Sequence, residues 1–124
     1  MIHEEICTYE VCKLAKEKGF NVQTFDWYDY TGNYNKGFIP RKLHECPRYK
    51  EYYAPTQGLL QRWLREERGI VIELKYSDST ESFRPFWSWQ IYNTLGITLE
   101  IGEPNTTYEL ALEDALKYAL ENLV

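Results

Sequence analysis

Apolar side chains recur at helical spacing in the middle of the chain, between residues 57 and 68. The stretch begins after Thr56, whose hydroxyl can accept a hydrogen bond from the first turn. It ends before Gly69, which can adopt the left-handed conformation of a helix end. The residues on its apolar face are Leu59, Leu60, Trp63 and Leu64. The pattern predicts a capped amphipathic helix over 57–68 that leads directly into a strand.

Two further stretches have the same spacing, one near each end of the chain. The first begins at Tyr9 and stops at Gly19. In the second, Thr106 and Glu109 have the spacing of a capping box, and apolar residues follow at intervals of three and four. Those residues are Leu112, Ala115, Leu116, Ala119, Leu120 and Leu123. We therefore predict three helices, each with one apolar stripe.

Runs of β-branched and aromatic residues predict strands between these helices. The predicted strands cover residues 22–30, 70–76, 86–92 and 97–101. Pro40 and Pro47 interrupt the stretch 35–53, so that stretch is an edge strand, a long loop or both. The order α-β-β-α-β-β-β-α indicates an α+β fold with one antiparallel or mixed sheet of about four to five strands and three helices, in a single domain over residues 1–124.

The composition is typical of a globular chain. Of its 124 residues, 44% are hydrophobic and 27% are charged, which excludes a largely disordered protein. The first residues lack the basic and apolar run of a signal peptide, and no stretch reaches transmembrane length. Three cysteines are an odd number, which favours reduced thiols over a disulfide framework. We therefore expect a cytoplasmic protein without membrane contacts.

Aromatic side chains are unusually frequent, with 11 Tyr, 4 Trp and 5 Phe. Trp87 and Trp89 fall on one face of the strand predicted over 86–92, whereas Tyr92 falls on the other face. If helices cover one side of the sheet only, some of these rings are left on an open face or edge, where they suit contact with another protein or a second copy. Cross-strand pairing of rings that stiffens the sheet is the alternative interpretation.

A basic and aromatic segment, residues 36–53, differs from the acidic remainder of the chain. The net charge is −5, but residues 36–51 hold five cations against two acids. The candidate contacts in this segment are Arg41, Lys42, Arg48, Tyr49 and Tyr52. Rings that stack on bases beside cations that hold phosphates are typical of proteins that bind single-stranded nucleic acid. The alternative function is therefore nucleic-acid binding, although the acidic remainder weighs against it.

Motifs with catalytic or metal-binding chemistry are scarce. Cys7, Cys12, His44 and Cys46 include ligand types that zinc accepts, but Cys12 falls on the apolar stripe of the first predicted helix, where a cysteine packs as a small hydrophobe. The sequence has no glycine-rich phosphate loop, no nucleophile elbow and no pair of histidines at helical spacing. We therefore predict no metal, no cofactor and no enzymatic activity.

Three segments also carry a family resemblance: residues 9–20 (YEVCKLAKEKGF), residues 54–66 (APTQ followed by QRWLRE) and residues 108–117 (YELALEDALK). They resemble a group of short proteins of unknown function encoded in gut Bacteroides-type bacteria and in phages and prophages of that lineage. The resemblance implies a shared fold and a phage-related accessory role, and it assigns no functional residue. Residues 39–53 depart most from the group. Our leading hypothesis is a small binding domain that acts through an aromatic sheet face or edge, with Trp87, Trp89 and Tyr92 as contacts.

Overall fold

The computed structural model describes residues 4–37, 51–78 and 85–124. Three helices and two antiparallel sheets of three strands each make up an α+β fold. In chain order the elements are α1 (Tyr9–Glu17), β1 (Trp27–Tyr28), β2 (Tyr34–Asn35), β3 (Tyr52–Tyr53), α2 (Gln57–Arg68), β4 (Ile70–Asp78), β5 (Pro85–Asn93), β6 (Thr98–Ile101) and α3 (Tyr108–Asn122).

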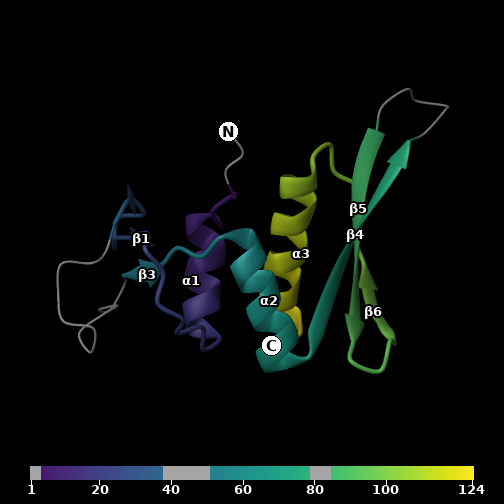
Figure 1. The fold of residues 1–124 in the computed structure, drawn as a ribbon, viewed down its shortest axis with the longest axis horizontal. Coiled ribbons are helices and arrows are strands. Elements are labelled where there is room, and N and C mark those ends of the chain that lie inside the picture. Colours follow the sequence, from purple (N-terminus) through teal and green to yellow (C-terminus); the bar gives the residue numbers. More distant parts are fainter. Residues whose placement is uncertain (1–3, 38–50, 79–84) are drawn as a thin grey trace.

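The elements are arranged in layers from the small sheet to the large sheet (Figure 1). The small sheet, in the order β2-β1-β3, lies beside α1 at one end of the molecule. Helices α2 and α3 follow, and the large sheet, in the order β4-β5-β6, lies at the other end. All three helices begin at the same end of the molecule. Because the large sheet is the last layer, the helices lie on one side of it only.

The structure confirms the central helix and both of its predicted end signals. The hydroxyl of Thr56 accepts a hydrogen bond from the backbone N–H of Leu59 (3.1 Å), and Gly69 ends the helix with φ of 67°. Its buried residues include Leu60, Trp63 and Leu64 from the predicted stripe. Local signals were sufficient here because each of them acts within one turn of the backbone.

The predicted capping box at the start of the last helix is wrong. Thr107 is the capping residue, and its hydroxyl accepts a hydrogen bond from the N–H of Leu110 (3.1 Å). Because a leucine occupies the third position of the helix, no side chain there can return a hydrogen bond to the cap, as a capping box requires. Thr106 and Glu109 have the right spacing, but the helix begins one residue later than they predict.

The prediction of one sheet is also wrong, because the strands divide into two sheets. Strand β1 pairs with β3 through Trp27 and Tyr53, and neither strand pairs with the large sheet. The strand predicted over 22–30 is reduced to two residues. The rings of this region pack on α1 instead, where Tyr9 contacts both Tyr28 and Tyr52 edge-to-face. Within the stretch 35–53, Asn35 ends β2, Tyr52 and Tyr53 form β3, and residues 38–50 lie outside the described ranges.

In the large sheet, β4 and β5 pair without interruption from Ile70 with Asn93 to Asp78 with Pro85. The predicted alternation along β5 is confirmed, because Trp89 and Ile91 are buried on the face that α3 covers. The alternate residues of β5, such as Gln90 between them, point to the opposite face. The sheet therefore has one face in the core and one face away from the helices.

Candidate functional site

The face of the large sheet that is turned away from the helices is the candidate site, and we call it the open face. It comprises Val71, Glu73, Lys75, Ser77, Phe86, Ser88, Gln90, Tyr92 and Ile101. These residues follow from the strand register, since side chains alternate between the two faces of a sheet. Among the described segments, no helix or strand lies over this face (Figure 1).

The short strand β6 supplies an exposed aliphatic side chain to the open face. Glu100 points toward the helices, because its carboxylate accepts a hydrogen bond from the hydroxyl of Tyr118 on α3 (2.7 Å). Its neighbour Ile101 therefore points the other way, and it pairs with Gln90 and is 60% exposed. Leu99 lies in the bulge beside Tyr92 and is 40% exposed. Strand β6, at the edge of the sheet, thus presents two aliphatic side chains to water, and the register places Ile101 on the open face.

The open face combines apolar and polar groups. Tyr92 is half-buried, and its hydroxyl donates a hydrogen bond to the side-chain carbonyl of Gln90 on the same face. Glu73 and Lys75 are both exposed, and neither makes an ion pair with another described residue. The open face therefore holds one acid and one cation within a largely uncharged surface.

Two of the sheet residues predicted to bind a partner lie on the helix side of the sheet instead. Trp89 is 4% exposed and packs against Tyr118. Trp87 is half-buried between Tyr76 and Tyr108, with ring centroids 5.2 Å and 5.1 Å away. Their rings fill space between the sheet and α3. The pair of Tyr76 and Trp87, which lie opposite each other on β4 and β5, is a cross-strand ring contact of the kind in the alternative interpretation. Of the three residues, Tyr92 alone faces away from the helices.

The candidate nucleic-acid contacts fall mostly outside the described part of the chain. Arg41, Lys42, Arg48 and Tyr49 are in the range 38–50, which the structure does not describe. Tyr52 is described and is buried, with the ammonium of Lys16 5.2 Å from its ring centre. Burial keeps this ring from stacking on a base, so nucleic-acid binding stays a prediction that depends on the other residues.

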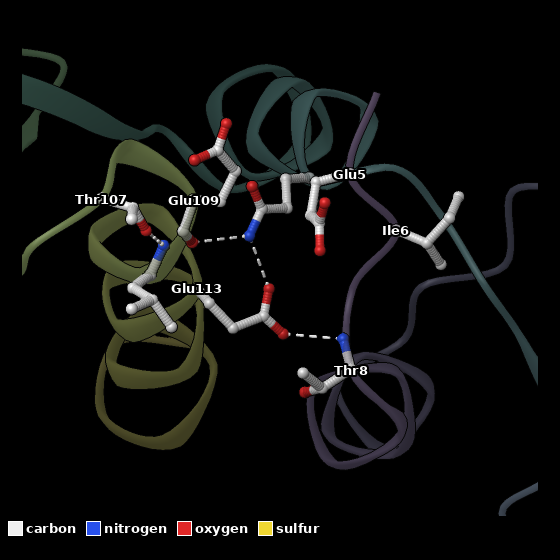
Figure 2. A pocket seen from close by; sticks show the side chains of 8 residues that line it. Glu5, Ile6, Thr8, Thr107, Glu109 and Glu113 are labelled. Carbon is white, nitrogen blue, oxygen red and sulfur yellow. Dashed lines mark hydrogen bonds between the residues drawn. The ribbon is translucent and has the colours of Figure 1, made fainter. Parts of the chain in front are cut away.

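A hollow of about 280 Å³ lies where the three helices begin (Figure 2). Glu113 of α3 crosses it: one carboxylate oxygen accepts from the backbone N–H of Thr8 (2.7 Å), and the other accepts from the side-chain amide of Gln57 (2.8 Å). The same amide also donates to the backbone carbonyl of Glu109 (2.9 Å). Glu113 and Gln57 thus join the beginnings of α1, α2 and α3. We assign these residues to the stability of the helix layer, because their polar atoms are used within it.

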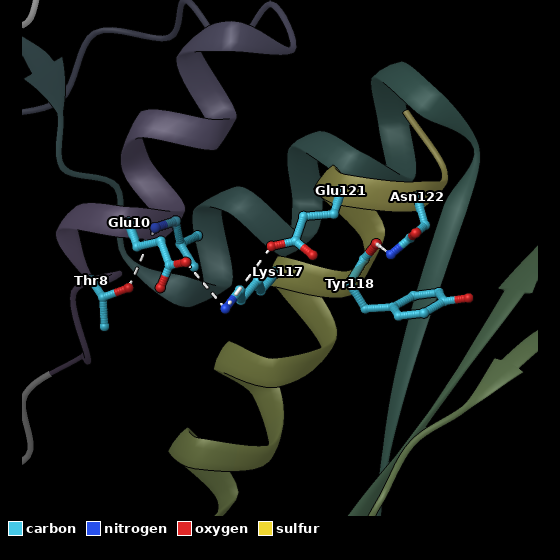
Figure 3. A network of polar contacts seen from close by, with 7 residues as sticks. Thr8, Glu10, Lys117, Tyr118, Glu121 and Asn122 are labelled. Atoms are coloured by element: carbon cyan, nitrogen blue, oxygen red, sulfur yellow. Dashed lines mark hydrogen bonds and ion pairs between the residues drawn. The ribbon is translucent and has the colours of Figure 1, made fainter.

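A second polar network joins α1 to α3 near the surface (Figure 3). The ammonium of Lys117 lies 3.1 Å from the carboxylate of Glu10 and 3.9 Å from that of Glu121. The proximity of Glu10 raises the pKa of Lys117. All three side chains are solvent-exposed, so these ion pairs contribute little to stability. They do not converge on a cavity that could hold a substrate.

Two of the four side chains with zinc-ligand chemistry, Cys7 and Cys12, lie in the described part of the chain. Cys7 and Cys12 are buried, and burial raises the pKa of both thiols, which keeps them protonated at neutral pH. Burial also raises the pKa of Tyr28, whose hydroxyl donates to the carbonyl of Cys7 (2.8 Å), to about 12. His44 and Cys46 lie outside the described residues. Within the ranges that the structure covers, no group of three metal-ligating side chains is found.

Comparisons with known proteins add no assignment to this geometry. No family model, no curated protein and no solved structure matches the chain. Among the described helices, none combines the length and the apolar character needed to cross a bilayer.

The open-face residues on β6 were not identified from the sequence. Leu99, Glu100 and Ile101 alternate between apolar and polar, which assigns Leu99 and Ile101 to one face of a strand. This alternation indicates a half-buried strand, and the usual interpretation places its apolar side in the core. The structure has the opposite arrangement, because Glu100 is held by Tyr118 on the helix side.

Proposed function

We propose that this chain is a non-enzymatic protein-binding domain and that the open face is its binding surface. The observation that carries the proposal is the exposure of Ile101, at 60%, on the face opposite the helices. Covering aliphatic surface is favourable by roughly 25 cal/mol per Å². Exposed apolar side chains that are contiguous, rather than scattered, are typical of interaction sites. On this face Ile101 adjoins Gln90 in register, Tyr92 pairs with Thr98 in the next row, and the exposed Leu99 lies in the bulge between these rows.

Tyr92 supports the same proposal through its chemistry. It is half-buried, and it presents both an apolar ring and a hydroxyl on the open face. Such amphipathic rings are enriched at interfaces because they bury a large area and still satisfy a polar group. The open face holds one acid and one cation, Glu73 and Lys75, so it carries no excess of either charge.

Site-specific photo-crosslinking in the native host tests this proposal. We would place a photoreactive amino acid at Ile101 on the open face, and in a matched variant at Leu110, which is 55% exposed on α3. We expect a defined covalent adduct with a protein from position 101 and none from position 110. Adding Tyr92→Arg to the first variant should abolish the adduct, because it places a charge on the open face one row away from Ile101. The absence of an adduct from position 101, or equal adducts from both positions, would contradict the proposal.

A further inference from the structure

The charges of the open face indicate which partner it fits. Glu73 and Lys75 stand two residues apart on β4, so both side chains point to this face, and both are exposed. Their formal charges cancel, whereas the chain as a whole carries −5. A surface that had to bind a basic partner would need an excess of acids, and a surface for an acidic partner would need an excess of cations. The open face has neither excess.

We propose that the partner of the open face is a second copy of the chain, packed face to face across a two-fold axis. In a two-fold interface, every contact between residue i and residue j is made twice. Leu74 lies between the two charged residues on β4. If the two-fold axis runs between the two sheets and crosses β4 at Leu74, Glu73 of each copy lies opposite Lys75 of the other. One acid and one cation on the same face are therefore sufficient for two intermolecular ion pairs. This inference rests on the proposed function, since it names the partner of the same surface.

The apolar residues of the face fit this arrangement. Tyr92 lies on β5, which pairs with β4, and Ile101 lies on β6 at the far edge of the same face, so two stacked sheets would bury both residues on the face that carries the ion pairs. Sheets packed face to face lie about 10 Å apart, with the side chains of the two faces interdigitating. The result would be a two-layer sandwich of sheets with the helices of each copy on the outside, where they do not obstruct contact.

The size of the face predicts a weak dimer. Strands β4 and β5 have nine residues each, and at about 3.3 Å per residue they are about 30 Å long. Each strand is about 4.8 Å wide, and β6 adds only four residues beside the two long strands, which gives a footprint of about 350 Å². This is smaller than the roughly 800 Å² per partner of a typical stable interface. We therefore expect association that depends on concentration, with a dissociation constant in the micromolar range or weaker.

The decisive experiment uses charge reversal with analytical ultracentrifugation from about 1 µM to about 1 mM, a range that covers such affinities. Wild-type protein should shift from monomer to dimer across this range. Glu73→Lys and Lys75→Glu should each raise the dissociation constant by at least about tenfold, because each places like charges opposite one another. An equimolar mixture of the two variants should associate again, since the cations of one then meet the acids of the other.

The matched control is Arg62→Glu on α2, which reverses a charge at an exposed site away from the open face. It should leave the dissociation constant unchanged, and circular dichroism should show that all variants keep the native fold. A wild-type chain that is monomeric at every concentration would overturn the inference. So would a dimer that Glu73→Lys weakens no more than the control, or a mixture that does not associate. If the chain is monomeric but position 101 still crosslinks to a different protein, the proposed function stands and only the identity of the partner is wrong.

Discussion

The indole ring of Trp89 occupies the space that a side chain at position 102 would fill. A Cβ atom built on Gly102 would lie 1.8 Å from Cε2 of the Trp89 ring, well inside contact distance. The two residues are neighbours in the sheet, because the N–H of Gly102 donates to the carbonyl of Trp89 (2.9 Å). Glycine at this position is thus what allows the ring to lie over position 102 and to contact Tyr118.

We predict that Gly102→Ala lowers the free energy of unfolding by about 1–3 kcal/mol, because the buried ring must move out of its position. Gly58→Ala is the matched control, since a Cβ at Gly58 meets nothing within 4 Å and the residue lies within α2. That change should stabilise the protein by up to about 1 kcal/mol, through the higher helix propensity of alanine. Urea unfolding followed by tryptophan fluorescence measures both. Equal effects of the two substitutions would contradict the role of Gly102.

Glu113 provides a second prediction. Its carboxylate accepts hydrogen bonds from the N–H of Thr8 and from the amide of Gln57, which is 5% exposed. Glu113→Ala leaves a buried donor without one of its partners, so we expect a loss of about 1–3 kcal/mol in the free energy of unfolding. The neighbouring Asp114 is exposed, and Asp114→Ala should change stability by less than about 0.5 kcal/mol. If chemical denaturation gives the same free energy of unfolding for both variants, the hydrogen bonds of Glu113 do not hold the helices together.

The fold could be predicted from the sequence wherever the signal lies within a few residues. The hydroxyl of Thr56, the left-handed Gly69 and the apolar spacing between them act locally, and the helix has the predicted bounds. The division into two sheets could not be predicted in this way. Strands β1 and β3 are two residues long, and they pair because their rings pack on α1 rather than because of their own periodicity.

The candidate site was predictable only in part, for a related reason. Period-two alternation predicted that Tyr92 and Trp89 lie on opposite faces of β5, and the structure agrees. Which of the two faces the helices cover is decided by contacts between distant segments, such as the hydrogen bond between Tyr118 and Glu100. The sequence pattern of β6 alone would place Ile101 on the helix side of the sheet, where the structure has Glu100 instead.

The position of the α3 cap can be tested by two substitutions at adjacent threonines. We predict that Thr107→Ala lowers the free energy of unfolding by about 1 kcal/mol, because the N–H of Leu110 loses its acceptor. Thr106→Ala should change it by less than about 0.5 kcal/mol, since Thr106 is exposed and does not cap the helix. Thermal or urea unfolding separates the two outcomes. A larger effect at position 106 would support the capping box that the sequence predicted.

The hydrogen bond between Tyr118 and Glu100 predicts a pH dependence of stability. The hydroxyl of Tyr118 donates to the carboxylate and holds the pKa of Glu100 below its ordinary value of 4.5. A lowered pKa in the folded state means that this contribution to stability is fully present above the unfolded pKa, and that it is lost as the pH falls through the folded pKa. Tyr118→Phe keeps the ring against Trp89 but removes the donor. We therefore expect wild type to exceed Tyr118→Phe in stability by a constant amount near neutral pH, and this difference should shrink as the pH falls below about 4.5.

Carboxyl chemical shifts from NMR should show Glu100 titrating at higher pH in the variant. Tyr108→Phe, at an exposed position of the same helix, should leave both quantities unchanged. If Glu100 titrates at the same pH with and without the Tyr118 hydroxyl, the hydrogen bond does not form in solution, and a different contact must keep Glu100 on the helix side of the sheet.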